Sequence, residues 1–188
     1  YTTLFRSSDD KCADAALKLL AKTPWRDLAL ADVAKAAKVS LAQLQALRGG
    51  KPALIGLILK KIGAETAKRY RAESDTARER LFDVAMAWFE ANARRKPAIR
   101  SLYDGLKFDP VTLISERGEF LAAAQWLMTL AKADTGPAIA ARAAGLALII
   151  ARAIPVWLDD DAEMTATMAR LDSDLSRAGG FVRKPSSP

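Results

Sequence analysis

Hydrophobic residues recur at helical spacing along almost the whole chain, and this pattern restricts the fold more than any other feature. Ala, Leu, Arg and Glu dominate, and runs of β-branched residues bounded by turns are scarce. Proline and glycine separate the helical segments. The pattern therefore predicts an all-α fold of about nine helices. We expect them over residues 8–22, 30–37, 41–47, 52–72, 76–95, 97–107, 110–132, 137–158 and 162–178.

Positive charge is concentrated near the N-terminus. The chain of 188 residues has a net charge of +7 and is 51% hydrophobic, which is enough to form a core. Residues 1–51 contain nine Lys/Arg and five Asp/Glu, a net charge of +4, whereas residues 52–188 contain twenty and seventeen, a net charge of +3. A basic N-terminal segment is compatible with an acidic partner such as DNA.

The chain has no histidine and one cysteine, Cys12. The usual Ser-His and Cys-His nucleophile pairs and His-ligated zinc are excluded, and no glycine-rich phosphate loop is present. We therefore expect no enzyme, no cofactor and no metal. The lone cysteine fits a reducing compartment, and the apolar run 143–151 is too short to span a bilayer. We expect a cytoplasmic protein with no membrane insertion.

Residues 30–47 have the pattern of a helix-turn-helix. Val33, Ala34 and Ala37 share one helical face, and Leu44 and Leu47 share another. The two faces meet across the short turn 38–40. Ser40 is the expected N-cap of the following helix, whose exposed N–H groups and positive dipole would favour a phosphate ahead of them.

This segment, 30-LADVAKAAKVSLAQL-44 followed by Lys51 and Leu54, resembles the TetR family of transcriptional regulators. The resemblance implies a three-helix DNA-binding head, residues 1–51, and a helical effector-binding and dimerisation body, residues 52–180, before a flexible tail, residues 181–188. It further implies a homodimer that binds double-stranded operator DNA and responds to an apolar small-molecule effector.

The chain departs from the family at three positions of this segment. Lys38 stands where members usually have Gly, Gln45 where they have Tyr, and Arg48 where they have Phe. A left-handed turn residue other than Gly costs on the order of 1 kcal/mol, so the turn either tolerates Lys38 or is remodelled. Lys51 matches the phosphate-contacting Lys of the family.

The expected DNA-binding residues combine base contacts with phosphate contacts. Gln43 and Gln45 can read base edges, and the basic side chains can position the helix on phosphates. The alternative is a solvated polar face on a head that no longer binds DNA. The full set is Lys38, Ser40, Leu41, Gln43, Gln45, Arg48 and Lys51.

Aromatic residues of the body suggest a pocket for an apolar small molecule, although core packing is the favoured explanation for any single one of them. Asn92, Tyr103 and Gln125 are the polar candidates within it. The expected pocket residues are Trp88, Phe89, Asn92, Tyr103, Phe120, Gln125 and Trp126.

The last two helices are expected to form a dimer interface. The run 138–158 is rich in small residues that allow close helix approach, and residues 164–175 carry a narrow apolar stripe. The acidic run 159–163 is explained by helix capping at Asp161 rather than by a metal. The expected interface residues are Ala143, Ala147, Ile150, Ile154, Met164, Met168 and Leu171.

A shorter resemblance connects residues 146–175 to the TetR-like lipid-binding proteins of ubiquinone biosynthesis. It implies an alternative function, a TetR-fold carrier of a lipid or hydrophobic metabolite that no longer binds specific DNA. The aromatic residues missing at Gln45 and Arg48 favour the carrier. The N-terminal charge, Ser40 and Lys51 favour the regulator.

Overall fold

The computed structural model describes the backbone of residues 2–45 and 50–178, and the side chains from residue 8 onward except residue 45. All regular structure in these residues is helical, as predicted. Arg48 and the tail 181–188 lie outside the described residues. The elements are α1 (Thr2–Leu20), η1 (Trp25–Asp27), α2 (Leu30–Ala37), α3 (Leu41–Gln45), α4 (Ala53–Arg69), α5 (Ala77–Asn92), η2 (Ala93–Arg95), α6 (Lys96–Lys107), α7 (Pro110–Ser115), α8 (Arg117–Leu130), α9 (Ile139–Asp159) and α10 (Thr165–Ala178).

The prediction of one helix over residues 110–132 is wrong, because the chain forms α7 and α8 there. α7 begins at Pro110, with the Asp109 side chain accepting the Thr112 N–H at 3.0 Å. It ends at Glu116, whose ψ of 7° leaves the helical region. Gly118 follows in the first turn of α8, and glycine favours helix weakly. A cap at each end of α7 therefore outweighs the apolar periodicity that runs through both helices.

The start of α10 also differs from the prediction. The expected cap, Asp161, accepts the N–H groups of Glu163 and Met164 through Oδ1 and closes a turn before the helix. Asp160 instead serves α10, because its Oδ2 accepts the N–H and the hydroxyl of Thr167, both at 2.7 Å. The acidic run is thus occupied with backbone capping.

The chain divides into two compact units, which are described separately. Unit 1 comprises residues 1–64 and 92–120, and unit 2 comprises residues 65–91 and 121–188. Unit 1 contains seventeen Lys/Arg and nine Asp/Glu, a net charge of +8, and unit 2 contains twelve and thirteen, a net charge of −1. The basic excess of the protein therefore resides in the unit that contains the helix-turn-helix.

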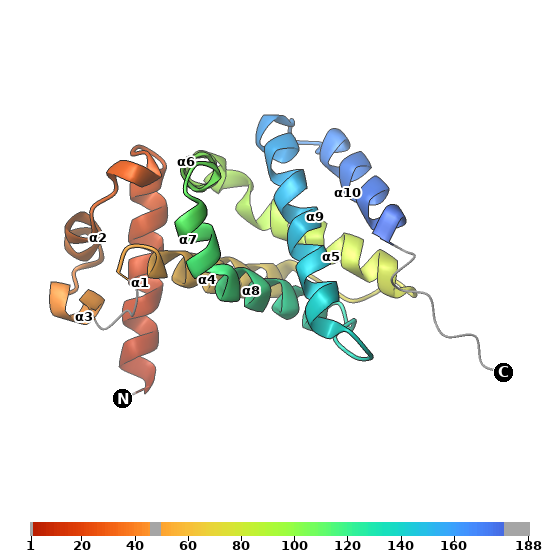
Figure 1. Cartoon of the computed structure of the whole chain (residues 1–188), viewed down its shortest axis with the longest axis horizontal. Helices are drawn as coiled ribbons and strands as arrows, with labels where there is room; N and C mark the ends of the chain where they lie inside the picture. Colours follow the sequence, from red (N-terminus) through yellow and green to blue (C-terminus); the bar gives the residue numbers. More distant parts are fainter. Residues whose placement is uncertain (1, 46–49, 179–188) are drawn as a thin grey trace. The chain divides into compact units, whose positions relative to one another are not determined.

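In unit 1, α1 is the central packing element. It contacts α2 and α6, and α6 also contacts η1. In Figure 1, α1, α2 and α3 have the red and orange colours of the N-terminal residues. Val33, Ala34 and Ala37 of α2 are buried, as their shared face predicted. This packing joins the helix-turn-helix to α6 through α1 and η1.

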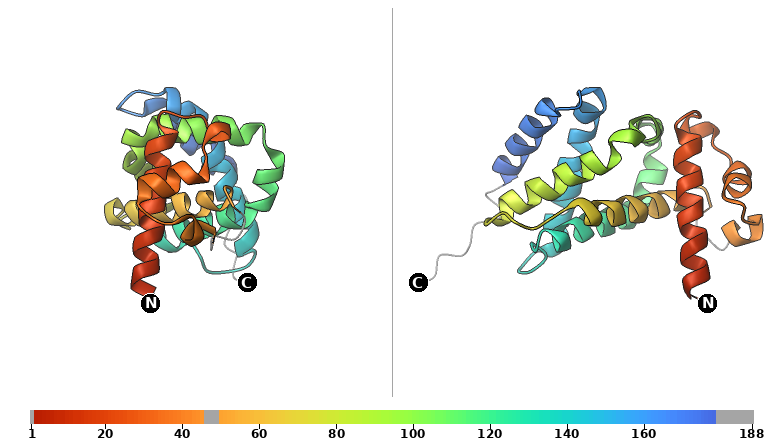
Figure 2. Two further views of the ribbon diagram at one scale, coloured as in Figure 1. Left: turned by 90° about the vertical axis from the view of Figure 1, so that its left-hand side faces the viewer. Right: turned by 180° about the vertical axis from the view of Figure 1, so that it is seen from behind.

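In unit 2, α9 and α10 lie side by side, as both Figure 1 and Figure 2 show. The Trp88, Phe89 and Trp157 rings form a cluster, with centroids 5.0 to 6.1 Å apart. The Arg78 guanidinium binds the Asp172 carboxylate and the Ser176 hydroxyl and so ties α5 to α10. These contacts define an aromatic core with polar cross-links at its edge.

α9 is the one helix of residues 2–45 and 50–178 that is long and apolar enough to cross a membrane. Its most apolar window has a mean hydropathy of 1.7, and 28% of that window is buried. A single such helix is weak evidence for a membrane span, because helices that pack against protein on both sides have the same composition.

Candidate nucleic-acid interface

The turn of the helix-turn-helix is built on Lys38 in the left-handed conformation, with φ 57° and ψ 43°. The N–H of Lys38 reaches the carbonyls of Ala34 and Lys35, and the N–H of Val39 donates to the Ala34 carbonyl at 3.0 Å. These bonds satisfy the last carbonyls of α2. The turn therefore keeps the conformation for which glycine is best suited, although it carries Lys.

Replacing Lys38 with Gly is expected to raise the free energy of unfolding by about 1 kcal/mol, because Gly adopts this backbone without the Cβ penalty. The Lys38 side chain is exposed, so little packing is lost. Urea denaturation measures the change. Lys35→Gly is the matched control, since Lys35 lies inside α2 and its replacement should instead cost about 1 kcal/mol. A less stable Lys38→Gly protein would contradict the strain argument.

Ser40 and Gln43 form a reciprocal capping box at the start of α3. Ser40 Oγ accepts the Gln43 N–H at 3.2 Å, and Gln43 Oε1 accepts the Ser40 N–H at 2.8 Å. The predicted N-cap at Ser40 is confirmed. The Gln43 side chain, expected to read bases, is turned back onto Ser40 instead. The spacing Ser-x-x-Gln is the sequence signal for this cap.

The described side chains of α3 include one large apolar side chain that is exposed to solvent. Leu41 is 56% exposed, whereas Leu44 is 2% exposed and packs into the head. Gln45 contributes its backbone to α3, and its side chain is not described. Leu41 thus stands at the exposed first turn of α3, beside the exposed Lys38 turn.

Lys51, the expected phosphate contact, is half-buried and bound to η1. Its Nζ donates to the Arg26 carbonyl at 3.0 Å and lies 4.8 Å from the centroid of the Trp25 ring. Burial lowers the pKa of Lys51, and Asp27 and Asp109 oppose that shift. An ammonium group has three donors. Lys51 can therefore hold η1 and still offer an N–H to a phosphate.

Trp25 and Gly105 fasten η1 to α6. Trp25 is 4% exposed, and a Cβ placed on Gly105 would lie 2.5 Å from the Trp25 Cβ. Only glycine permits this approach. Beside it, the Ser101 hydroxyl donates to the Thr23 carbonyl at 2.9 Å. This contact could not be predicted from the sequence, because no local pattern pairs residue 25 with residue 105.

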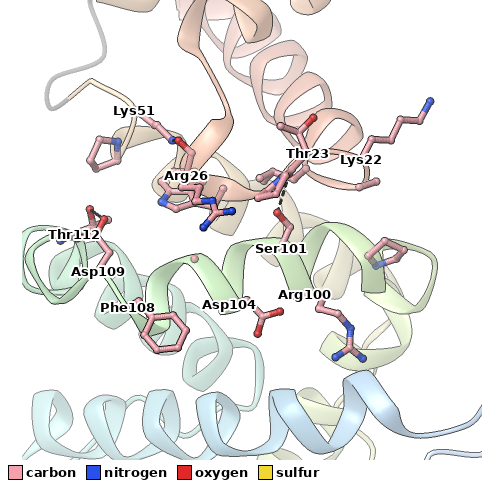
Figure 3. Close-up of a pocket in the computed structure, with 17 residues that line it drawn as sticks. Lys22, Thr23, Arg26, Lys51, Arg100, Ser101, Asp104, Phe108, Asp109 and Thr112 are labelled. Carbon is pink, nitrogen blue, oxygen red and sulfur yellow. Dashed lines mark hydrogen bonds between the residues drawn. The ribbon is translucent and has the colours of Figure 1, made fainter.

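A groove of about 1080 Å³ lies along this junction, entirely within unit 1. Its walls are the end of α1 with η1, the start of α4, and α6 with the start of α7. Figure 3 shows Ser101 on the side of α6 that faces Thr23, with Arg100, Asp104 and Phe108 along another side. None of the seven predicted pocket residues lines this groove.

The predicted pocket residues are distributed over both units. Asn92, Tyr103 and Phe120 belong to unit 1, and the other four to unit 2. Trp88, Phe89 and Asn92 are buried, Tyr103 and Phe120 are half-buried, and Gln125 and Trp126 are exposed. Trp88 and Phe89 contact each other in the aromatic core, which favours the packing interpretation for these two.

The predicted dimer residues differ in exposure. Ala143, Ile150 and Leu171 are buried, Ala147, Ile154 and Met164 are half-buried, and Met168 is exposed. The exposed side of α9 is a neighbouring face of mostly small residues around Leu148, which is 59% exposed. Its members are Ala141, Ala144, Gly145, Leu148, Ala151 and Arg152, here named the α9 face.

Cys12 is buried in α1, and burial, aided by Asp9, raises the pKa of its thiol. The thiolate, which is the reactive form, is therefore disfavoured. Among residues 2–45 and 50–178, no cluster of three His, Cys, Asp or Glu side chains could hold a metal ion.

Neither a family model nor a curated protein sequence matches the chain. Solved structures do match, and two of them are TetR transcriptional regulators. A TetR transcriptional regulator from Nitrosomonas europaea ATCC 19718 is 22% identical with a TM-score of 0.64, and the alignment covers 92% of this chain and 98% of that one. A TetR transcriptional regulator from Rhodococcus sp. RHA1 is 14% identical with a TM-score of 0.69, covering 92% and 95%.

The chain has the TetR fold. The near-complete coverage of both chains extends the similarity well beyond the helix-turn-helix, where the sequence resemblance was most specific. The fold predicted from residues 30–44 is confirmed. At these identities the similarity concerns the fold, and function has to be argued from the site.

Proposed function

We propose that the chain is a TetR-like one-component transcriptional regulator that binds operator DNA as a homodimer and is released by an apolar small-molecule effector. The observation that carries this proposal is a capped helix-turn-helix within a unit of net charge +8. A basic surface supplies the sequence-independent part of DNA affinity. A capped helix with an exposed first turn is the element that enters a major groove.

Within this proposal, α3 is the recognition helix. Leu41 would contact a thymine methyl group, since apolar side chains at the start of a recognition helix read that group. Gln45 keeps its proposed base-reading role, and Arg48 a proposed phosphate contact. Gln43 takes a different role, because its amide holds the Ser40 N–H and so fixes the start of the helix. Lys38 and Lys51 are proposed phosphate contacts on either side.

Replacing Lys51 with Ala is expected to weaken binding to every DNA sequence and to lower the slope of log K against log salt by about one unit per site. Anisotropy titrations between 50 and about 200 mM salt give the slope. Lys60→Ala is the matched control, because Lys60 is an exposed lysine further along α4. Circular dichroism checks that the Lys51→Ala protein still folds without the contact between the Lys51 ammonium and the Trp25 ring. Equal slopes for the two variants would exclude a phosphate contact by Lys51.

For the homodimer we propose the α9 face together with the exposed parts of α10. Small residues allow two helices to approach closely, and a two-fold arrangement would present two recognition helices about one DNA turn apart. Leu148 and Met168 are the large apolar side chains exposed on these two helices. Of the predicted interface residues, Met168 is exposed and could contact the partner directly. The buried residues Ala143, Ile150 and Leu171 would support the interface by packing beneath it.

For release, the effector must bind one dimer geometry more tightly than the other. The aromatic cluster of Trp88, Phe89 and Trp157 is the proposed apolar contact for the effector. In this structure the three rings pack against one another. α6 is the proposed element that transmits effector binding to the DNA-binding helices, because Gly105 of α6 packs closely against Trp25 of η1. We propose no catalytic role, and we propose a cytoplasmic location.

The second candidate is a carrier of a lipid or hydrophobic metabolite on the same fold. It is favoured by the occupation of Gln43 and Lys51 in intramolecular bonds. Solvent extraction of the purified protein followed by mass spectrometry tests it. A stoichiometric bound lipid, together with equal binding to operator and scrambled DNA, would support the carrier over the regulator.

A further inference from the structure

The groove between η1 and α6 has the dimensions of a small-molecule site. Its volume of about 1080 Å³ lies just above the range of roughly 300–1,000 Å³ that such sites occupy. All its walls belong to unit 1, so the groove does not depend on how the two units are placed. Lys51, Trp25 and Gly105 line the groove and have proposed roles above, but no occupant is proposed above for the space itself.

An exposed aromatic ring lines the groove. Phe108 follows the last residue of α6 and is 80% exposed, the largest value among the exposed large hydrophobic side chains of the described residues. Pro24, Pro52 and Pro97 contribute further apolar surface. The Lys107 Nζ lies 5.4 Å from the centroid of this ring, which otherwise remains largely open to solvent. The ring offers a flat face for an apolar ligand body.

The charged side chains of the groove favour an anion. Lys22, Arg26 and Arg100 line it together with one carboxylate, Asp104. Lys51 and Asp109 also line it, but these two interact with each other and offset one another. Arg26 pairs with Asp27 through Nε at 3.6 Å, with its side chain 84% exposed, so its guanidinium remains accessible to solvent. Guanidinium groups bind carboxylates, phosphates and sulfonates through paired hydrogen bonds.

We infer that the groove is a second ligand site, which takes an organic anion with a planar apolar body. The ring of the ligand packs on Phe108, and its acidic group binds Arg26 and Arg100. A ligand there contacts both η1 and α6, the two elements that Trp25 and Gly105 hold together. This inference does not rest on DNA binding, and it concerns a site separate from the aromatic cluster of unit 2.

A pair of fluorescent probes separates the two parts of the site. The probes are 8-anilinonaphthalene-1-sulfonate and N-phenyl-1-naphthylamine, which share a ring system but differ in the sulfonate. Phe108→Ala is expected to weaken binding of both probes. The double change Arg26→Gln with Arg100→Gln is expected to weaken the sulfonate probe by about tenfold or more and to change the neutral probe less than about twofold.

Two control variants keep the test specific. Arg117→Gln removes an exposed cation of unit 1 that does not line the groove, and Trp126→Ala removes an exposed aromatic ring of unit 2. Neither should change the affinity for either probe by more than about twofold. Circular dichroism establishes that all variants are folded before they are compared.

The place of binding is read by fluorine NMR of protein labelled with 5-fluorotryptophan, with each of the four resonances assigned by a Trp→Phe variant. Saturating sulfonate probe should shift the Trp25 resonance. Probe binding that shifts only Trp88 or Trp157, or that is unchanged by the Phe108 and Arg26/Arg100 variants, would overturn the inference. So would the absence of binding at millimolar probe.

Discussion

Replacing Trp25 with Ala is expected to lower the free energy of unfolding by about 3–5 kcal/mol, the usual cost of removing a large buried aromatic side chain. Trp25 is 4% exposed and packs at its Cβ against Gly105. The Lys51 Nζ also lies 4.8 Å from the centroid of the Trp25 ring. The substitution therefore removes apolar burial, a cation–π contact and the attachment of η1 to α6 together. Urea denaturation followed by circular dichroism measures the change.

Trp126→Ala is the control for this prediction, because the same residue type is 44% exposed on α8 and should cost far less. Gly105→Ala tests the contact from the other side. It should destabilise the wild-type protein by about 1–3 kcal/mol through overpacking. In the Trp25→Ala background the same change should cost less, since the contacts with the indole Cδ1 at 2.8 Å and Cγ at 2.9 Å are gone, although the Cβ contact at 2.5 Å remains. Additive effects of the two substitutions would contradict the close approach.

Replacing Leu148 with Glu is expected to raise the dissociation constant of the homodimer by about a hundredfold or more. Leu148 is the large side chain at the centre of the α9 face, and it is 59% exposed. In a two-fold interface the substitution introduces two carboxylates near the axis, where each would be desolvated beside a like charge. Analytical ultracentrifugation over micromolar concentrations resolves a 20.3 kDa monomer from a dimer of twice that mass.

Leu113→Glu is the matched control, because Leu113 is an exposed leucine on α7 and lies outside the α9 face. It should leave the dimer intact. A Leu148→Glu protein that dimerises as tightly as the wild type would remove the α9 face from the interface. A wild-type protein that is monomeric at micromolar concentration would remove the two-fold operator arrangement as well.

Local features were predictable from the sequence to a large extent. α2 has the predicted bounds, and its buried face is the predicted one, because periodicity and turn residues act within a few positions. Ser40 is the N-cap because its hydroxyl lies within reach of the Gln43 N–H, three residues further along the chain. The break between α7 and α8 was missed because capping at Asp109 and Glu116 competes with an uninterrupted apolar pattern.

Long-range features were less accessible. The contact between Trp25 and Gly105 joins residues eighty positions apart, and neither residue carries a local signal for it. On α9, periodicity identifies an apolar helix but does not say which side faces its own unit, so buried and exposed residues were grouped in one predicted interface. The groove in unit 1 likewise depends on three separate segments coming together.

The central claim, specific DNA binding by the helix-turn-helix, is tested most directly by fluorescence anisotropy. The protein is titrated against a duplex from immediately upstream of its own gene and against a scrambled duplex, at several salt concentrations. We expect binding to the upstream duplex to be about a thousandfold or more tighter than to the scrambled one, with a steep salt slope. Weak and equal binding to both duplexes would contradict it and would identify the helix-turn-helix as a structural element alone.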